Sequence, residues 1–227
     1  MKFKALVLSA LLLALAACEK KESAPAEVNL ATDEDRFSYS LGMLVGERVL
    51  KQYGDVDYQL LLAGMKAQHQ GQATLLTLEE AGDSLNAHSE KQFAEQSAGN
   101  RERGEAYLKS NAEKDGVQVT ESGLQFSVLT PADGPKPKAT DEVTVHYRGT
   151  LIDGTEFDSS YSRGAPTSFT LNQVIPGWTE GLQLMSIGAK YQFVIPFSLG
   201  YGERGAGGQI GPFETLIFEV ELIDIKS

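Results

Sequence analysis

The sequence has few of the residues that catalytic, redox and metal sites usually employ. Its 227 residues include one cysteine, one tryptophan and three histidines. A single cysteine, Cys18, excludes a disulfide within the chain. His69, His88 and His146 lie far apart without the spacing of metal ligands, so each is expected to be a surface or hydrogen-bonded residue. No GxSxG motif marks a serine nucleophile, and the Gly-rich stretch GYGERGAGG lacks the ending of a phosphate loop. We therefore expect neither a metal nor a cofactor.

Basic residues are also scarce. Lysine and arginine number 20 against 31 acidic residues, which leaves a formal net charge of -11. No basic cluster occurs beyond the N-terminus. Because a nucleic-acid-binding surface needs the opposite balance of charge, we exclude nucleic acid as a partner.

The N-terminal apolar run, ALVLSALLLALAA, is too short to span a bilayer. It follows two lysines in MKFK and ends in small residues, which is the pattern of a secretory signal peptide, assigned here to residues 1–17. The sequence LAAC at the cleavage region resembles the lipobox of bacterial lipoproteins, in which the cysteine is lipidated. We expect lipidation of Cys18. The alternative is an ordinary signal peptide in which Cys18 is incidental.

Lipidation would anchor the chain to a membrane, because acyl chains contribute about 0.8 kcal/mol per buried methylene. The residue after the lipidated position is Glu19, not the aspartate that often retains such lipoproteins in the inner membrane. We therefore expect an outer-membrane lipoprotein that faces the periplasm or the cell surface. Without lipidation, the protein is expected to be soluble in the periplasm.

Residues 18–31 are polar, small and proline-containing, and are predicted to form a flexible tether. Helical periodicity then predicts helices within 32–54 and 55–72. A third helical stretch runs from Thr77 to Gly116 without proline and begins with a capping box formed by Thr77 and Glu80. Its apolar positions are sparse, which favours a solvated connector between two domains.

The two shorter helices cannot form a core by themselves. Their apolar faces need a partner, and we predict a homodimer through residues 32–116. The alternative is that these helices fold back on the C-terminal domain.

Residues 117–227 are rich in glycine and in alternating β-formers. In VTVHYRG, the side chains of Val143, Val145 and Tyr147 share one face, and TLIFEVELIDI shows the same alternation. Such alternation is typical of an antiparallel sheet covered on one side only. The one helical candidate, from Gly177 to Met185, is short. The predicted fold class is therefore α+β, with a curved antiparallel sheet wrapped around one short helix.

Aromatic residues are the main candidates for a functional site in this domain. Six of them can converge on the concave side of such a sheet: Tyr147, Phe157, Phe169, Trp178, Tyr201 and Phe218. An ordinary hydrophobic core is the alternative explanation, and composition alone favours it.

The arrangement of several motifs along the chain favours a functional site over an ordinary hydrophobic core. The segments VHYRGTLIDGTEFDSS, VIPGWTEGLQL, GYG and TLIFEVELIDI resemble the FK506-binding (FKBP) family of peptidyl-prolyl cis-trans isomerases. The resemblance covers about 110 residues and implies the same curved-sheet fold. The N-terminal helices resemble the dimerisation region of the macrophage infectivity potentiator-like (Mip-like) members of this family.

The resemblance implies roles for nine residues. Trp178 corresponds to the floor on which the substrate proline rests, with walls from Tyr147, Phe157 and Phe218. Val174 and Ile175 correspond to the rim, and the Ile175 amide to a donor toward a substrate carbonyl. Asp158 and Tyr201 correspond to a polar pair at the edge, and Ile210 lies in the flap.

Three positions depart from the family pattern. Thr167 stands where phenylalanine is common, which is expected to open the pocket on one side. Gly211 is expected to loosen the flap, and Phe213 to add a contact there.

The resemblance implies that this protein is a prolyl isomerase that helps exported proteins fold in the bacterial envelope. Its partners would be unfolded or partly folded proline-containing polypeptides. The competing hypothesis is a dimeric chaperone or adaptor that recognises proline with little isomerase activity. A structural lipoprotein with an inert core is disfavoured, because it gives Asp158 and Tyr201 no reason to lie within an aromatic cluster.

Overall fold

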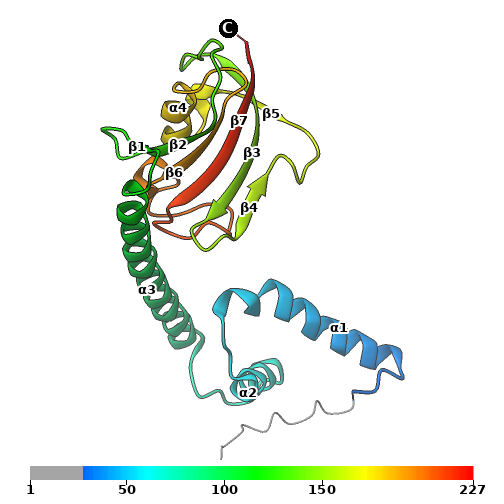
Figure 1. The fold of residues 1–227 in the computed structure, drawn as a ribbon. Helices are drawn as coiled ribbons and strands as arrows, with labels where there is room; N and C mark the ends of the chain where they lie inside the picture. Colours follow the sequence, from blue (N-terminus) through cyan, green and yellow to red (C-terminus); the bar gives the residue numbers. More distant parts are fainter. Residues whose placement is uncertain (1–27, 227) are drawn as a thin grey trace, which may run out of the picture. The chain divides into compact units, whose positions relative to one another are not determined.

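The computed structural model describes residues 28–226, and its chain separates into two compact units, Met1–Ala73 and Thr74–Ser227 (Figure 1). The expectations for the signal peptide and for Cys18 concern residues outside the described range.

The first unit contains helices α1 (Asp33–Arg48) and α2 (Tyr58–His69), with a 3-10 turn (Leu50–Tyr53) between them. Thr32 and Asp35 form a capping box at the start of α1, and Asp57 caps α2. Gly54 ends the 3-10 turn with φ of 67°, a left-handed value that glycine adopts easily. The predicted helices are thus confirmed.

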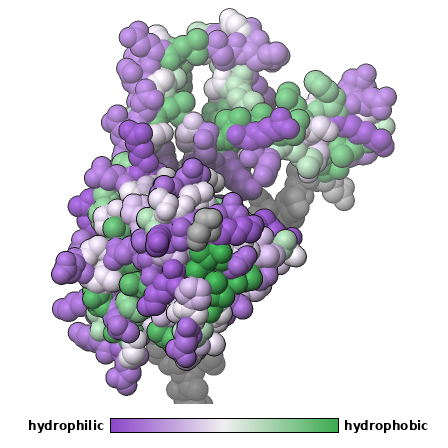
Figure 2. Space-filling view, turned by 90° about the horizontal axis from the view of Figure 1, so that it is seen from above, coloured by the Kyte–Doolittle hydropathy of each residue, from purple (hydrophilic) through white to green (hydrophobic). Residues whose placement is uncertain are grey.

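Neither α1 nor α2 has a buried residue. Phe37 is 69% exposed and Leu60 is 71% exposed. Figure 2 shows green apolar side chains at the molecular surface among purple polar ones. The apolar residues of these two helices are thus largely open to solvent in a single chain.

The second unit begins with the long helix α3 (Leu78–Ala112). The predicted capping box is confirmed, since Thr77 Oγ1 accepts from the Glu80 amide at 3.1 Å and Glu80 Oε2 accepts from the Thr77 amide at 2.8 Å. Across residues 28–226, no helix is both long enough and apolar enough to cross a membrane.

The sheet of this unit comprises seven strands: β1 (Val117–Val119), β2 (Gln125–Thr130), β3 (Glu142–Leu151), β4 (Glu156–Ser159), β5 (Thr167–Thr170), β6 (Lys190–Ile195) and β7 (Leu216–Lys226). Their order is β1-β2-β6-β7-β3-β4, and β5 also pairs with β3. All these pairings are antiparallel. Short 3-10 turns (Leu171–Gln173 and Phe197–Leu199) and helix α4 (Pro176–Leu182) complete the unit.

The concave face of the sheet packs against α4, as Figure 1 shows. Val143, Val145 and Tyr147 from β3 and Phe218, Val220 and Leu222 from β7 are buried there. Glu219 and Glu221 alternate with them and are partly exposed. The predicted α+β fold and its strand faces are confirmed.

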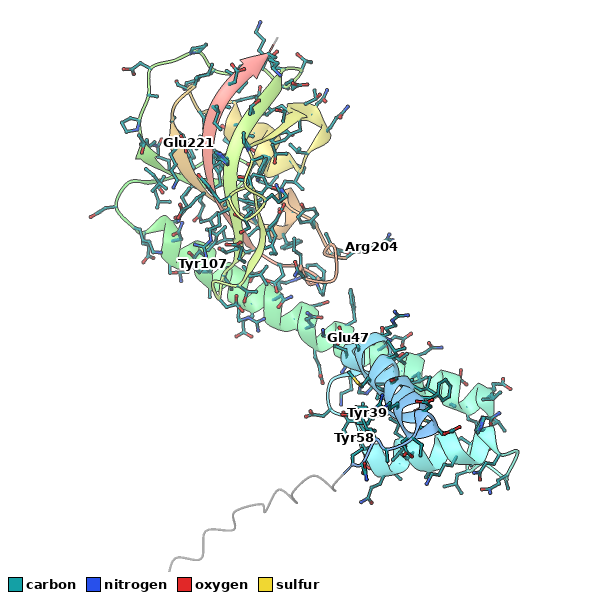
Figure 3. All side chains as sticks on the ribbon, turned by 90° about the vertical axis from the view of Figure 1, so that its right-hand side faces the viewer. Tyr39, Glu47, Tyr58, Tyr107, Arg204 and Glu221 are labelled. Atoms are coloured by element: carbon teal, nitrogen blue, oxygen red, sulfur yellow. The ribbon has the colours of Figure 1, made fainter. Side chains whose placement is uncertain are left out.

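The prediction that α3 is a solvated connector is wrong for its second half. Asn100, Gly104 and Asn111 of α3 are buried. Asn111 Nδ2 donates to Gln125 Oε1 at 2.9 Å, and Gln125 Nε2 donates to the Leu108 carbonyl at 2.8 Å. Figure 3 shows Tyr107 on this part of α3, next to the sheet. The helix can be so polar because it docks through hydrogen bonds.

The expected one-sided sheet is therefore also incorrect at one end. Gln125 and Val194 are paired in register on neighbouring strands and lie on the face opposite the main core. They are nevertheless only 4% and 1% exposed. The hydrogen bonds from Gln125 show that α3 covers the outer face here.

Candidate active site

A cavity of about 620 Å³ opens on the concave side of the sheet. All nine residues predicted to form the site line it. The full lining is Tyr147, Phe157, Asp158, Thr167, Phe169, Gln173, Val174, Ile175, Trp178, Tyr201, Ala206, Gly207, Gln209, Ile210 and Phe218.

Trp178 is at the centre of the aromatic cluster. Its ring centroid lies 5.0 Å from that of Tyr147, 5.1 Å from Phe218 and 5.2 Å from Phe169. The contacts with Tyr147 and Phe218 are edge-to-face, which is a favoured geometry for aromatic rings. Trp178 is 6% exposed, and its Nε1 has no hydrogen-bond partner among residues 28–226. The cluster thus provides a rigid apolar floor.

The walls depend on a glycine in β3. Gly149 pairs with Phe218 of β7, and Phe157 packs against Phe218 with ring centroids 5.5 Å apart. A Cβ at Gly149 would lie 2.7 Å from the Phe218 ring and 2.8 Å from the Phe157 ring. Only glycine therefore lets both rings occupy these positions.

Val174 and Ile175 form the rim just before α4. The Ile175 carbonyl accepts from the amides of Trp178 at 2.9 Å and Thr179 at 3.1 Å, which fixes the start of the helix. Thr179 Oγ1 donates to the Leu171 carbonyl at 2.6 Å, which ties the preceding turn to the same helix. Within the described part of the chain, the Ile175 amide has no hydrogen-bond acceptor. This donor is available to a ligand.

Tyr201 and Ile210 stand at the two ends of the loop over the cavity. The Phe213 amide donates to the Gly202 carbonyl at 3.0 Å, and Ala206 and Ile210 exchange backbone hydrogen bonds at 2.9 and 3.0 Å. The loop is thus closed at its base by the Phe213–Gly202 hydrogen bond and held further along by the Ala206–Ile210 pair.

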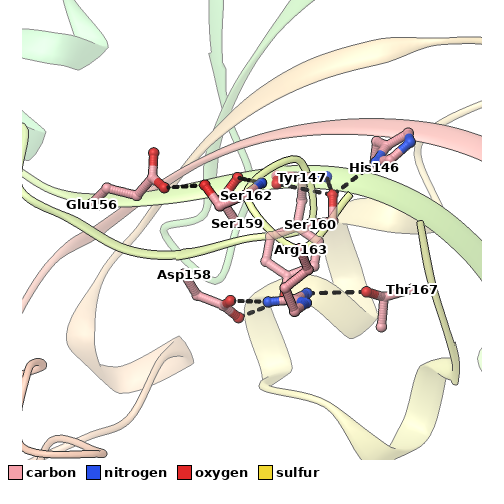
Figure 4. A network of polar contacts seen from close by, with 9 residues as sticks. All are labelled: His146, Tyr147, Glu156, Asp158, Ser159, Ser160, Ser162, Arg163 and Thr167. Atoms are coloured by element: carbon pink, nitrogen blue, oxygen red, sulfur yellow. Dashed lines mark hydrogen bonds and ion pairs between the residues drawn. The ribbon is translucent and has the colours of Figure 1, made fainter. Parts of the chain in front are cut away.

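A polar network lies at the edge of the cavity (Figure 4). Asp158 accepts from the Tyr147 hydroxyl and from the Arg163 guanidinium. Arg163 Nη2 also donates to Tyr147 Oη at 2.7 Å and to Thr167 Oγ1 at 3.1 Å. Asp158 and Tyr201 both line the cavity as expected, but the phenol that is hydrogen-bonded to Asp158 is Tyr147.

Both phenols at the site hold their protons firmly. Burial raises the pKa of Tyr147 above its ordinary value of 10.0, with a further upward contribution from the hydrogen bond to Asp158 and an opposing one from Arg163. Burial also raises the pKa of Tyr201 above 10.0, assisted by the charge of Asp158. Tyr147 and Tyr201 are therefore hydrogen-bond donors at neutral pH.

Sequence reasoning missed Arg163. It follows Asp158 by five positions in SSYSRG, on the chain that leads from β4 to β5. Gly164 has a φ of 75° and turns the chain there. The only available indication was a cation close in sequence to the candidate carboxylate.

Behind Tyr147, a fully buried serine fixes the strand. Ser160 Oγ accepts from the Tyr147 amide at 2.7 Å and is 2.9 Å from His146 Nδ1. His146 also stacks on Tyr161, with centroids 4.6 Å apart. The expectation that His146 is a surface or hydrogen-bonded residue is confirmed by this geometry.

Of the three residues that depart from the family pattern, two behave differently from expectation. Thr167 lines the cavity, but Phe213 is outside the lining and packs against Phe197 with centroids 4.9 Å apart. Gly211 lies against α3, where a Cβ would be 2.7 Å from Gln96 Nε2. Gly211 thus permits close packing of the flap, and the loosening expected of it is opposed by this contact.

Comparison with known proteins finds family models that match two regions of the chain. Residues 134–223 match the family model described as FKBP-type peptidyl-prolyl cis-trans isomerase. Residues 34–128 match the model of the domain amino-terminal to FKBP-type peptidyl-prolyl isomerase.

Similar proteins include the outer membrane protein MIP of Legionella longbeachae, 42% identical over 87% of this chain and 88% of that protein. The FKBP-type 22 kDa peptidyl-prolyl cis-trans isomerase of Escherichia coli is 44% identical over 86% of this chain and 96% of that protein. Among solved structures, FkpA from Escherichia coli has a TM-score of 0.67 at 36% identity and covers 86% of this chain and 98% of its own.

Proposed function

The chain belongs to the family of FKBP-type peptidyl-prolyl cis-trans isomerases, and from this premise we propose how its pocket turns a prolyl bond. The observation that carries the proposal is the aromatic cavity around Trp178 with an unpaired amide at its rim. The proposed organisation is a signal peptide (1–17), a tether (18–31), a helical dimerisation region with its connector (32–116) and the isomerase domain (117–227).

The reaction is slow in water because rotation must break the resonance of the amide, a barrier of about 18–20 kcal/mol. The planar amide is more polar than the twisted transition state, so water favours the planar form. A cavity lined by Trp178, Phe157 and Phe218 withdraws that solvation and makes the twisted amide relatively more favourable. This mechanism transfers no proton and forms no covalent bond to the enzyme.

Hydrogen bonds then hold the substrate while it turns. The Ile175 amide donates to a substrate carbonyl, and the Tyr201 hydroxyl provides a second donor at the opposite edge. Asp158 acts through its negative charge, and Arg163 and Tyr147 fix the carboxylate in place. Val174 and Ile210 complete the apolar enclosure.

The cellular role proposed is assistance to the folding of exported, proline-containing polypeptides in the bacterial envelope. A similar protein is named as an outer membrane protein, which supports this location. We further propose that lipidated Cys18 anchors the chain to the outer membrane. Mass spectrometry of the mature N-terminus tests the anchor: an unmodified cysteine, or cleavage elsewhere, contradicts it.

A second function, chaperone activity, is favoured by the exposed apolar side chains of α1 and α2. Those that stay exposed after pairing with a second chain can hold an unfolded client. Suppression of aggregation of a proline-free client measures this activity separately from isomerisation.

A protease-coupled assay on a proline-containing tetrapeptide tests the main function. The mature chain should accelerate the cis-to-trans step, and a macrolide inhibitor should remove the acceleration. Acceleration that persists with the cavity filled by inhibitor would contradict the assigned site.

A further inference from the structure

The second half of α3 contacts the segment that directly follows the flap residue Ile210. The polar contact is buried: Asn100 is 2% exposed, and its Nδ2 donates to the Pro212 carbonyl at 2.7 Å. Arg103 Nη2 donates to Asn100 Oδ1 at 2.6 Å. Because Arg103 occupies the acceptor atom of this amide, the Asn100 NH₂ group is held toward Pro212.

Close packing accompanies this bond. A Cβ at Gly211 would lie 3.0 Å from Asn100 Nδ2, and a Cβ at Gly104 would lie 2.5 Å from Thr215 Oγ1. Both glycines thus allow the helix and the segment 211–215 to approach more closely than other residues permit. The helix and this segment are therefore closely packed against each other.

Phe213 shows that the interface holds a strained conformation. Its φ of 56° is the one positive φ of a non-glycine residue within 28–226. A bulky residue adopts this left-handed value only where its surroundings stabilise it. The Arg101 guanidinium lies 4.2 Å from the Phe213 ring centroid and provides a cation–π contact from α3.

The backbone carries this restraint to the cavity along two routes. Gly211 joins the held segment to Ile210, which is 8% exposed and lines the cavity. The Phe213 amide donates to the Gly202 carbonyl, next to Tyr201. Both ends of the active-site loop therefore depend on the position of residues 212–213.

We propose that Asn100 and Arg101 of α3 are positioning residues for the isomerase pocket. They hold Pro212 and Phe213, and thereby set where Ile210 and Tyr201 stand against the substrate. The helix that was expected to be a solvated connector is, in its second half, part of the enzyme. This inference rests on the proposed function of the cavity.

The test compares two identical substitutions in α3 of the full mature chain. Asn100→Asp keeps the acceptor for Arg103 but replaces the donor to Pro212 with an acceptor. Asn111→Asp is the matched control, because Asn111 is equally buried in α3 but bonds to Gln125 on the sheet. Both variants are measured for kcat and KM on a proline tetrapeptide, and for thermal stability.

Asn100→Asp should raise KM about three- to tenfold with a smaller change in kcat, since the loosened loop binds substrate less well. Asn111→Asp should lower the melting temperature and leave both constants near the wild-type values. Equal effects of the two variants on KM, or none from Asn100→Asp, would overturn the proposal.

Arg101 provides a second test if Asn100→Asp does not fold. Arg101→Gln should weaken the binding of a macrolide, which is measured through the fluorescence of Trp178. Arg101→Lys should retain most of the wild-type affinity because the cation remains. Arg101→Gln with wild-type affinity would count against the proposal. A wild-type chain without isomerase activity would instead refute the proposed function, so the two failures are distinguishable.

Discussion

At the scale of single residues, Asp158 is the one charged residue among those that line the cavity. It is partly exposed and paired with Arg163 and Tyr147, so its removal should disturb the electrostatics of the cavity more than the fold. Asp158→Ala should lower kcat/KM at least about tenfold, which corresponds to about 1.4 kcal/mol in the transition state. The melting temperature should change little.

Asp224→Ala is a suitable control, because Asp224 is an exposed carboxylate on β7 outside the cavity. An unchanged rate for Asp158→Ala in the protease-coupled assay would show that the residue assignment is wrong.

The two phenols predict the pH dependence. Their folded-state pKa values lie above the ordinary value of 10.0, so the folded state binds these protons more tightly than the unfolded state does. The stability they contribute is therefore complete below about pH 10 and is lost as pH rises further. Between about pH 7 and pH 9, titration of Tyr147 and Tyr201 should leave both kcat/KM and the melting temperature unchanged. A fall in kcat/KM within this range, with the fold intact, would contradict the account.

At the scale of secondary structure, strands β3, β4 and β7 build the walls of the cavity, through Tyr147, Phe157 and Phe218 respectively. Phe218→Ala should cost about 3–5 kcal/mol of stability and most of the activity, as truncation of a buried aromatic residue does. Denaturant unfolding and the prolyl assay measure the two effects.

Gly149→Ala tests the effect of moving the wall rings, as distinct from the effect of removing one. The added methyl group must displace the rings of Phe157 and Phe218, although both rings remain present. We expect lower activity at a stability cost of about 1–3 kcal/mol, typical of overpacking. Full activity in a stable variant would show that the wall positions do not matter.

The sequence predicted these elements well because strand faces follow from alternation alone. Val143, Val145 and Tyr147 had to share one side of β3, and Trp178 had to begin a short helix after Pro-Gly. It did not predict the docking of α3. Asn100 and Asn111 read as solvent-facing polar residues, and only their tertiary partners Pro212 and Gln125 make them buried ones. The sequence likewise did not predict the role of Arg163, because only the folded chain brings it to Asp158, Tyr147 and Thr167.

At the scale of the whole molecule, the exposed apolar side chains of α1 and α2 predict a homodimer. The mature full-length chain should sediment as a dimer, and Phe37→Asp should shift it toward the monomer. Ser40→Asp is the control on the same helix, since Ser40 is exposed and polar. The full chain is preferable to an isolated fragment ending at residue 116, because the fragment would expose Asn100 and Asn111 of α3. A wild-type monomer would contradict the prediction.

The central claim is that the cavity around Trp178 turns a prolyl bond by enclosing it. The most direct test is exchange NMR of a proline peptide with the mature chain, which needs no coupling protease, alongside the fluorescence of the only tryptophan. The account predicts that peptide binding changes the Trp178 emission and that the cis–trans exchange rate rises in proportion to the enzyme concentration. A changed emission with exchange at the uncatalysed rate would contradict it, since the cavity would then bind proline without turning it.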